Sequence, residues 1–146
     1  MNKIKQISAE FIEENTNFLE LISEIKQYFS SDEVIVPMRH HHDFPNPKVQ
    51  ADSTLFLMPA WNPGKNAGVK IVTVSPENGQ FDLPSIHGVY IYFDAIKGFI
   101  KAIIEAKSLT VKRTAAASAL ASSYLSRKDA SSLLMIGTGA LSTNLI

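Results

Sequence analysis

Cysteine is missing from this chain, which excludes disulfide bonds and thiolate chemistry. The chain also lacks a net charge, because 14 basic residues balance 14 acidic ones, so no long-range field draws it to nucleic acid or to an acidic membrane surface. Apolar runs are all shorter than the ~18 residues of a membrane span, and residues 1–15 lack the continuous apolar segment of a secretory signal. These absences predict a soluble, cytoplasmic protein with neither nucleic-acid nor membrane partners.

Local patterns predict an α+β fold for the 146 residues, which are enough for one ordinary domain with a core. Ser8 is a good N-cap for one or two amphipathic helices that end near Phe29. Apolar runs then predict about five strands with hairpin-type connections, over residues 34–36, 54–58, 69–75, 87–93 and 99–106. A long helix of small residues, capped by Ser108 or Thr110, follows the strands and runs to about Leu125.

Three consecutive histidines, His40 to His42, raise the question of a metal site. Three adjacent side chains cannot all converge on one ion, and no acidic or cysteine partner stands at ligand spacing. We therefore predict a polar loop here without a metal, followed by a proline-containing connector over residues 44–50.

Two cations stand on or beside predicted strands. Arg39 directly follows a strand, where its side chain can be held in place, although a lone arginine is more often a surface residue. Lys70 alternates onto the same strand face as Val72 and Val74, so its ammonium either reaches water at an edge or meets an anion. His87, at the start of a later strand, is more often a structural residue than a catalytic one in such a position.

A second pair of cations, Lys112 and Arg113, falls in the first turn of the predicted small-residue helix. This end of a helix is already electropositive, so cations there cost free energy unless an anion binds. The pair indicates either two solvated side chains or an anion site that Arg113 shares with helix amides and Thr114.

A glycine turn closes the chain. Residues 133–136 form a fully apolar run of the buried parallel-strand type, and Gly137 and Gly139 permit a tight turn that approaches a pyrophosphate. The usual third glycine is replaced by Ser142, and the acidic residue expected about 20 positions later would lie past Ile146. The pattern indicates only the opening strand and turn of a truncated Rossmann unit.

Several ordered motifs together resemble the ornithine cyclodeaminase/μ-crystallin family of NAD(P)-dependent proteins, from residue 34 to the C-terminus. They are LFLMPAW, GVKIVTV, LPSIHGVYIYFDAIKG, LTVKRTAAASALASSYL and LLMIGTGA. The resemblance implies a substrate-binding and dimerisation domain over residues 1–127, incomplete without a C-terminal segment, and the start of an NAD(P)-binding domain over residues 128–146. A homodimer and an NAD or NADP cofactor are implied with it.

The resemblance also implies roles for individual residues. The cations that hold a substrate carboxylate would be Arg39, Lys70 and Arg113. The residues that line the pocket would be Met58, Ser85 and His87, and the residues that contact the dinucleotide would be Thr114, Gly137, Thr138, Gly139 and Ala140. Phe56 stands where the stricter cyclodeaminases carry a glutamate, and the catalytic aspartate of the family would come from beyond this chain.

The implied chemistry is hydride transfer at the α-carbon of a small amino or imino acid, either conversion of ornithine to proline and ammonia or reduction of a cyclic ketimine. The alternatives are an alanine dehydrogenase and a non-catalytic binding protein such as a crystallin. Because half a nucleotide fold cannot hold a dinucleotide, we expect the 146-residue chain by itself to be inactive.

Overall fold

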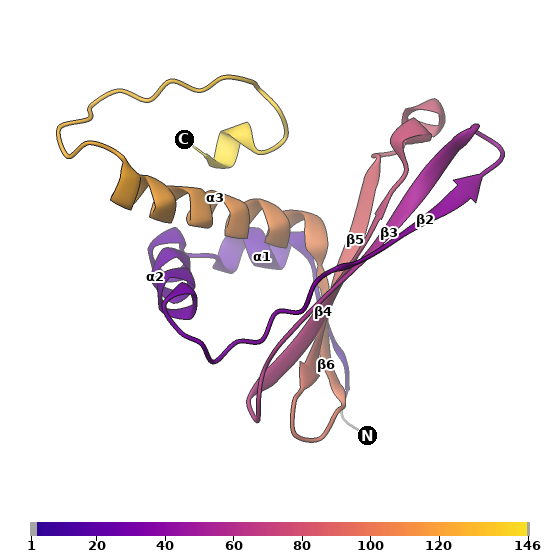
Figure 1. The fold of residues 1–146 in the computed structure, drawn as a ribbon, viewed down its shortest axis with the longest axis horizontal. Coiled ribbons are helices and arrows are strands. Elements are labelled where there is room, and N and C mark those ends of the chain that lie inside the picture. The colour runs from indigo at the N-terminus through magenta and orange to yellow at the C-terminus, as the bar shows by residue number, and fades with distance from the viewer. Residues whose placement is uncertain (1–2, 146) are drawn as a thin grey trace.

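The computed structural model describes residues 3–145, which form a six-stranded mixed sheet with three α-helices (Figure 1). The helices are α1 (Ala9–Asn15), α2 (Phe18–Phe29) and α3 (Ala106–Leu125). The strands are β1 (Lys5–Ile7), β2 (His40–Asn46), β3 (Ala51–Asn62), β4 (Asn66–Val74), β5 (Ile86–Asp94) and β6 (Ile100–Glu105). Two 3-10 turns, η1 (Pro76–Phe81) and η2 (Ser142–Asn144), complete the described elements. The predicted α+β class is confirmed.

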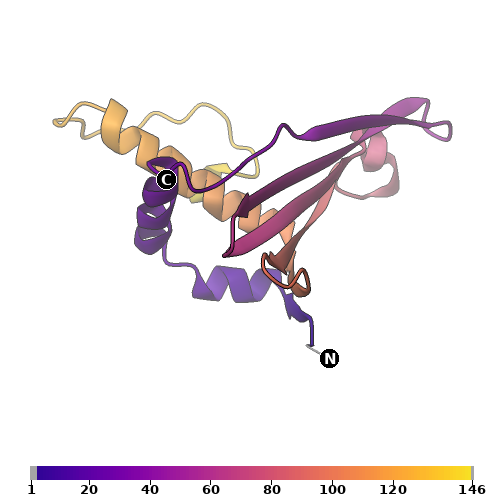
Figure 2. The ribbon, with the colours of Figure 1, turned by 60° about the horizontal axis from the view of Figure 1, so that its bottom comes forward.

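The sheet has the strand order β1-β6-β5-β4-β3-β2. Consecutive strands from β2 to β6 pair antiparallel, whereas β1 pairs parallel with β6 at one edge. The helices lie to one side of this sheet, and α3 leaves directly from the end of β6 (Figures 1 and 2). The predicted hairpin connections are therefore confirmed, and the sheet has one face covered by helices.

Strand register decides which side chains share the covered face. Met58, Lys70, Tyr90 and Ile104 pair across β3 to β6 and form one row. In the next row Gly88 lies so close to α3 that a Cβ built on it would be 3.4 Å from the Cβ of Ala106. We call this side, which carries Lys70, the helix face, and the opposite side, which carries Leu57, Ile71 and Val89, the outer face.

The helix starts follow from local capping. The Ser8 hydroxyl accepts a hydrogen bond from the Phe11 amide at 3.3 Å, as predicted, and Asn17 caps a separate second helix. The start of α3 was predicted wrongly, because the helix begins at Ala106 rather than after Ser108 or Thr110. Glu105, the last residue of β6, caps it by accepting two backbone amides, and this carboxylate suits the positive end of the helix dipole.

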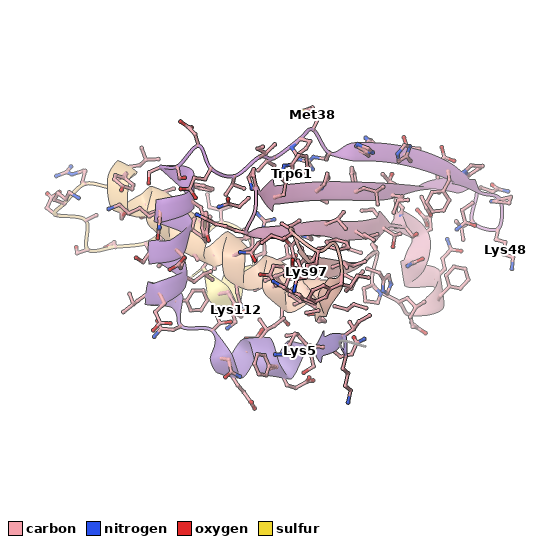
Figure 3. The ribbon with its side chains drawn as sticks, turned by 90° about the horizontal axis from the view of Figure 1, so that it is seen from below. Lys5, Met38, Lys48, Trp61, Lys97 and Lys112 are labelled. Carbon is pink, nitrogen blue, oxygen red and sulfur yellow. The ribbon has the colours of Figure 1, made fainter. Side chains whose placement is uncertain are left out.

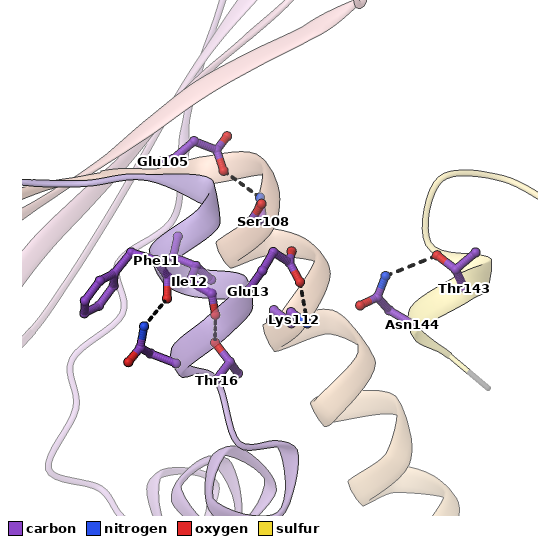
Figure 4. Close-up of polar contacts among 10 residues, drawn as sticks. Phe11, Ile12, Glu13, Thr16, Glu105, Ser108, Lys112, Thr143 and Asn144 are labelled. Carbon is purple, nitrogen blue, oxygen red and sulfur yellow. Dashed lines mark hydrogen bonds and ion pairs between the residues drawn. The ribbon is translucent and has the colours of Figure 1, made fainter.

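Small residues on α3 let it pack closely against α1 and α2. Ala106, Ala115, Ala116 and Leu120 are buried on it. Lys112 is buried with them, and its ammonium lies 2.6 Å from the Glu13 carboxylate on α1 (Figure 4). The same ammonium lies 5.0 Å from the centre of the Phe18 ring. Lys112 therefore joins α3 to α1 and α2, so the alternative in which both cations of the pair are solvated is wrong for this residue.

Two predictions around the histidines were wrong. Residues 34–36 make only an isolated bridge, between Ile35 and Trp61, whereas His40–Asn46, predicted as loop and connector, forms the edge strand β2. An edge strand buries little side-chain surface, so polar residues and Pro45 are tolerated there while the backbone pairs with β3.

No helix within residues 3–145 is long and apolar enough to cross a membrane.

The predicted strand over residues 133–136 is not formed. Residues 130–138 are irregular, and Leu133, Leu134 and Ile136 are 70%, 84% and 93% exposed. A strand requires a neighbouring strand for its backbone hydrogen bonds, and none within residues 3–145 pairs with this segment. The predicted opening strand of a Rossmann unit is therefore not formed within residues 3–145, and Ile146, the last residue of the predicted second domain, lies outside the described part.

Candidate functional site

Lys70 occupies the middle of β4 on the helix face. Its ammonium donates a hydrogen bond to the Thr110 hydroxyl of α3 at 2.6 Å. Partial burial lowers the pKa of Lys70, and the positive charge of Arg113 lowers it further. Lys70 thus lies in the middle of the sheet rather than at an edge, and it meets no negative group within residues 3–145, although the sequence had left both possibilities open.

Arg113 lies on the side of α3 that meets Lys70. Thr110, Arg113 and Thr114 are spaced i, i+3 and i+4, so they share one face of the helix, and Thr110 contacts the lysine. Because α3 begins at Ala106, Arg113 stands about two turns into the helix, not in its first turn. The predicted contribution of free helix amides to an anion site is therefore wrong. Arg113 still shares a helix face with Thr110, the hydrogen-bond partner of Lys70, and its charge lowers the pKa of Lys70.

Arg39 directly precedes β2. Its guanidinium carbon lies 6.0 Å from the centre of the Phe56 ring. His40 pairs with Leu57, so Arg39, one residue earlier, stands beside Met58, and Met58 is the direct partner of Lys70. We call Arg39, Lys70 and Arg113 the cation site; Phe56 and Met58 give it an apolar floor.

The three cations of this site have no carboxylate partner within residues 3–145. Four other basic side chains do have one: Lys65 pairs with Glu33, Lys101 with Asp94, Lys112 with Glu13 and Arg127 with Asp129. A half-buried ammonium without a counter-charge is unfavourable, and a second cation beside it increases the cost. The arrangement can therefore gain free energy by binding a small anion, and guanidinium groups are well matched to a carboxylate.

Ser85 and His87 are not brought to the cation site. His87 pairs with Thr73, which alternation places on the outer face, opposite to Lys70. Ser85 is held in the connection before β5, where its hydroxyl donates to the Pro76 carbonyl oxygen at 3.3 Å and its own carbonyl accepts from the Ser75 amide at 2.8 Å. Within a single copy of the chain, the structure thus does not support a joint action of these two residues with Lys70.

The glycine turn lies apart from any strand. Gly137 has a φ of +101°, a conformation that glycine adopts without strain. The Gly139 carbonyl accepts hydrogen bonds from the amide and the hydroxyl of Ser142 at 3.0 and 2.8 Å, which begins η2. A dinucleotide site of the predicted kind needs this turn between a strand and a longer helix, so residues 3–145 do not assemble one.

Sequence reasoning missed the aromatic stack at the β2 edge. His41 packs on Phe56 with ring centres 4.9 Å apart, and its imidazole contacts Asp43 at 3.0 Å. His40 and His42 alternate onto the opposite face, and residues 3–145 contain no group of three side chains suited to a metal ion. Reading residues 40–46 as a strand would have found this alternation, and would have placed Arg39 and His41 on one side.

Comparisons with known proteins agree with this fold. A family model described as the ornithine cyclodeaminase/mu-crystallin family matches residues 3–145. The Delta(1)-pyrroline-2-carboxylate reductase of Colwellia psychrerythraea is 37% identical over 144 residues, which make up 98% of this chain and 45% of that protein.

Solved structures show the same arrangement. The Delta(1)-pyrroline-2-carboxylate reductase of Thermococcus litoralis, in complex with NADH and L-proline, has a TM-score of 0.72 at 27% identity, over 86% of this chain and 39% of that one. An archaeal alanine dehydrogenase dimer with bound NAD has a TM-score of 0.74 at 26% identity, over 86% of this chain and 38% of that chain. The chain spans less than half the length of the curated relatives it matches. By its sequence and its fold, the chain belongs to the ornithine cyclodeaminase/mu-crystallin family.

Proposed function

We propose that this chain supplies the carboxylate-binding part of an NAD(P)-dependent enzyme that acts on a small amino or imino acid. The observation that carries the proposal is the cation site, three positive side chains on the helix face without a carboxylate partner in residues 3–145. Binding the substrate carboxylate there would neutralise the site and orient the α-carbon, so the contribution of these residues is positioning and electrostatic stabilisation.

The substrate that the site fits best is a cyclic imino acid such as pyrroline-2-carboxylate. Several relatives are named Delta(1)-pyrroline-2-carboxylate reductases, and the floor of the cation site is apolar at Phe56 and Met58. A diamino acid such as ornithine carries a second ammonium that needs a negative partner. The carboxylate that β2 offers on this face, Asp43, is already bonded to His41 and Thr54. Cyclodeamination is therefore the second candidate.

NAD or NADP is the proposed cofactor, and it would supply or accept the hydride. Structures of relatives hold NADH or NAD, but residues 3–145 of this chain do not form a complete dinucleotide fold. Thr114 and Gly137–Ala140 stay predicted contacts, and we assign no step of hydride transfer to any residue of this chain. Turnover is expected to require the further length that the relatives possess, so we expect the 146-residue chain to show no NAD(P)H oxidation.

The outer face of the sheet is the proposed dimer interface. Apolar side chains from neighbouring strands cover it, and no helix in residues 3–145 lies on this side (Figure 2). They include Leu55, Leu57, Val69, Ile71, Val89, Ile91 and Ile103. A second copy of the chain would bury them, and one structural neighbour is an alanine dehydrogenase dimer. An Ile71→Asp variant should then elute as a monomer in size-exclusion chromatography with light scattering, while the unchanged chain elutes as a dimer.

Carboxylate binding can be tested on the 146-residue chain itself. The probe is pyrrole-2-carboxylate, a stable planar analogue of the cyclic imino acid, and pyrrole-2-carboxamide is the matched probe without the charge. We expect saturable shifts of the Lys70, Thr110 and Arg113 amide signals in ¹H–¹⁵N NMR with the carboxylate only. Arg113→Ala should weaken binding about tenfold, since a hydrogen-bonded ion pair contributes roughly 1.5 kcal/mol.

The control is Lys107→Ala, which removes an exposed lysine near the start of α3. It subtracts the same charge without touching the cation site, so it should change affinity less than twofold. Equal effects of the two variants, or equal binding of the carboxamide, would refute the proposed carboxylate site.

A further inference from the structure

A hollow of about 390 Å³ lies at the edge of the sheet formed by β1 and β6, lined by Lys3, Lys5, Tyr92, Phe99, Lys101 and Ala102. We call it the edge hollow. Lys5, labelled in Figure 3, pairs with Ala102 in the β1–β6 register. Phe99 stands at the start of β6, whereas α3 leaves from the other end of that strand, so the edge hollow is distinct from the cation site.

Positive charge dominates the edge hollow. Three lysines line it, and the carboxylate at its border, Asp94, pairs with Lys101 at 3.0 Å. Asp94 also accepts the backbone amides of Ile96 and Lys97, and these bonds together with Lys101 hold its pKa below the usual range. The Asp94 carboxylate is thus bonded within the β5–β6 turn and to Lys101. The ammonium groups of Lys3 and Lys5 have no carboxylate partner in residues 3–145.

Two aromatic rings give the edge hollow a flat, apolar side. Tyr92 is fixed by a hydrogen bond from its hydroxyl to Asn66, and the Lys101 ammonium lies 5.5 Å from the centre of its ring. Phe99 stands at the start of β6 and is half-buried. Rings held in this way can stack on a planar group, while the lysines beside them attract a negative one.

We propose that the edge hollow binds an organic phosphate with a planar ring, of the size of a nucleoside monophosphate. Its volume falls in the range of small-molecule sites, about 300–1,000 Å³. The phosphate contacts Lys3 and Lys5, and the planar ring stacks on Tyr92 or Phe99. This site does not depend on the carboxylate-binding proposal, because none of its residues belongs to the cation site.

The test compares three probes on the 146-residue chain by ¹H–¹⁵N NMR titration: adenosine 5′-monophosphate, adenosine and inorganic phosphate. The monophosphate should shift the amide signals of Phe99, Lys101 and Ala102 in a saturable manner. Adenosine and phosphate alone should each bind at least fivefold more weakly, since each retains only one of the two kinds of contact.

Paired variants separate the contributions. The double substitution of Lys3 and Lys5 by alanine should weaken monophosphate binding about tenfold, as each surface ion pair contributes a factor of roughly three. Double alanine substitution of Lys48 and Lys107, two exposed lysines elsewhere, removes the same charge and should change affinity less than twofold. Phe99→Leu should weaken the binding of the monophosphate and leave the binding of inorganic phosphate unchanged.

The outcomes are decisive in both directions. The site is supported if the double substitution of Lys3 and Lys5 weakens monophosphate binding and the double substitution of Lys48 and Lys107 does not. The proposal is overturned if both double variants lose equal affinity, if binding does not saturate by 10 mM monophosphate, or if the amide signals that shift are those of Lys70 and Arg113. Circular dichroism of each variant checks its fold. Lys3 and Lys5 are both exposed, one just before the short edge strand β1 and the other at its first position, so their substitution is not expected to unfold the chain.

Discussion

Lys70 on β4 and Lys112 on α3 are both withdrawn from water, but they should respond differently to the same substitution. Lys112 is paired with Glu13 at 2.6 Å, whereas Lys70 has only the Thr110 hydroxyl and the repulsion of Arg113. Methionine keeps much of the length of either side chain without its charge. We therefore expect Lys112→Met to destabilise the protein and Lys70→Met to leave its free energy of unfolding nearly unchanged or raised.

The magnitudes follow from the contacts that each substitution removes. Lys112→Met breaks an ion pair whose lysine side chain is only 11% exposed and removes the cation from the Phe18 ring, so the expected loss is about 1–2 kcal/mol. Glu13 stays 49% exposed, and water can solvate it, which keeps the cost below that of a fully buried pair. Lys70→Met gives up one hydrogen bond, roughly 1 kcal/mol net, but also removes a desolvated charge and its repulsion by Arg113.

Urea unfolding at pH 7, followed by circular dichroism, measures the difference directly. The two variants should differ by at least 1 kcal/mol at equal slopes of free energy against urea concentration. The same Lys70→Met protein should lose its affinity for pyrrole-2-carboxylate, which Lys112→Met should keep. If Lys70→Met destabilises as much as Lys112→Met, the claim that Lys70 is held at a cost for ligand binding is wrong.

Three further predictions concern the pH dependence of the site and the packing around it. The pKa of Lys70 is lowered in the free protein, and a bound carboxylate raises it again. The affinity for the carboxylate should therefore be highest at pH values below the lowered pKa and should fall as the pH rises from that value toward 10.5, which NMR titrations at several pH values would show. Gly88→Ala should lower the free energy of unfolding by about 1–3 kcal/mol, because the new Cβ would lie 2.8 Å from the Ile71 carbonyl oxygen. Gly79→Ala is the control: a Cβ at that position has nothing within 4 Å, so the free energy of unfolding should change by less than about 0.5 kcal/mol in the same urea experiment. Glu105→Ala removes the acceptor of two amides at the start of α3 and should lower the thermal midpoint by a few degrees, corresponding to about 1 kcal/mol.

The four strands over residues 54–105 could be predicted because their evidence is local. Each carries an apolar run or apolar alternation within itself and is joined to the next by a turn with glycine, proline or asparagine. The edge strand β2 could not be found in this way, since its polar side chains reflect exposure and only the pairing with β3 makes it a strand. The strand predicted over residues 133–136 was wrong for the converse reason. Its apolar pattern is typical of a strand, but a strand forms only where a second strand pairs with its backbone.

The candidate site could be predicted in part. Alternation placed Lys70 on one face with Val72, which the register confirms. The sequence assigned the anion site to Arg113 but did not show that Lys112 is buried, because adjacent helical residues point about 100° apart and only the packing of α1 places Lys112 against Glu13. It also missed the start of α3, since the capping carboxylate of Glu105 belongs to the preceding strand.

The two faces of one strand are compatible with both the proposed dimer and the proposed carboxylate site. Successive residues of β4 point to opposite sides, so Lys70 faces α3 while Ile71 faces outward. A second copy seated on the outer face would bury Ile71 and its apolar neighbours without covering the cation site, which opens between the sheet and α3. The helix layer in turn lowers the dielectric around Lys70 and gives it Thr110 to bond. Because one face carries the apolar contacts and the other carries the unpaired cations, binding of a small acid need not disturb assembly, and the charge that costs stability is confined to the face where a ligand can neutralise it.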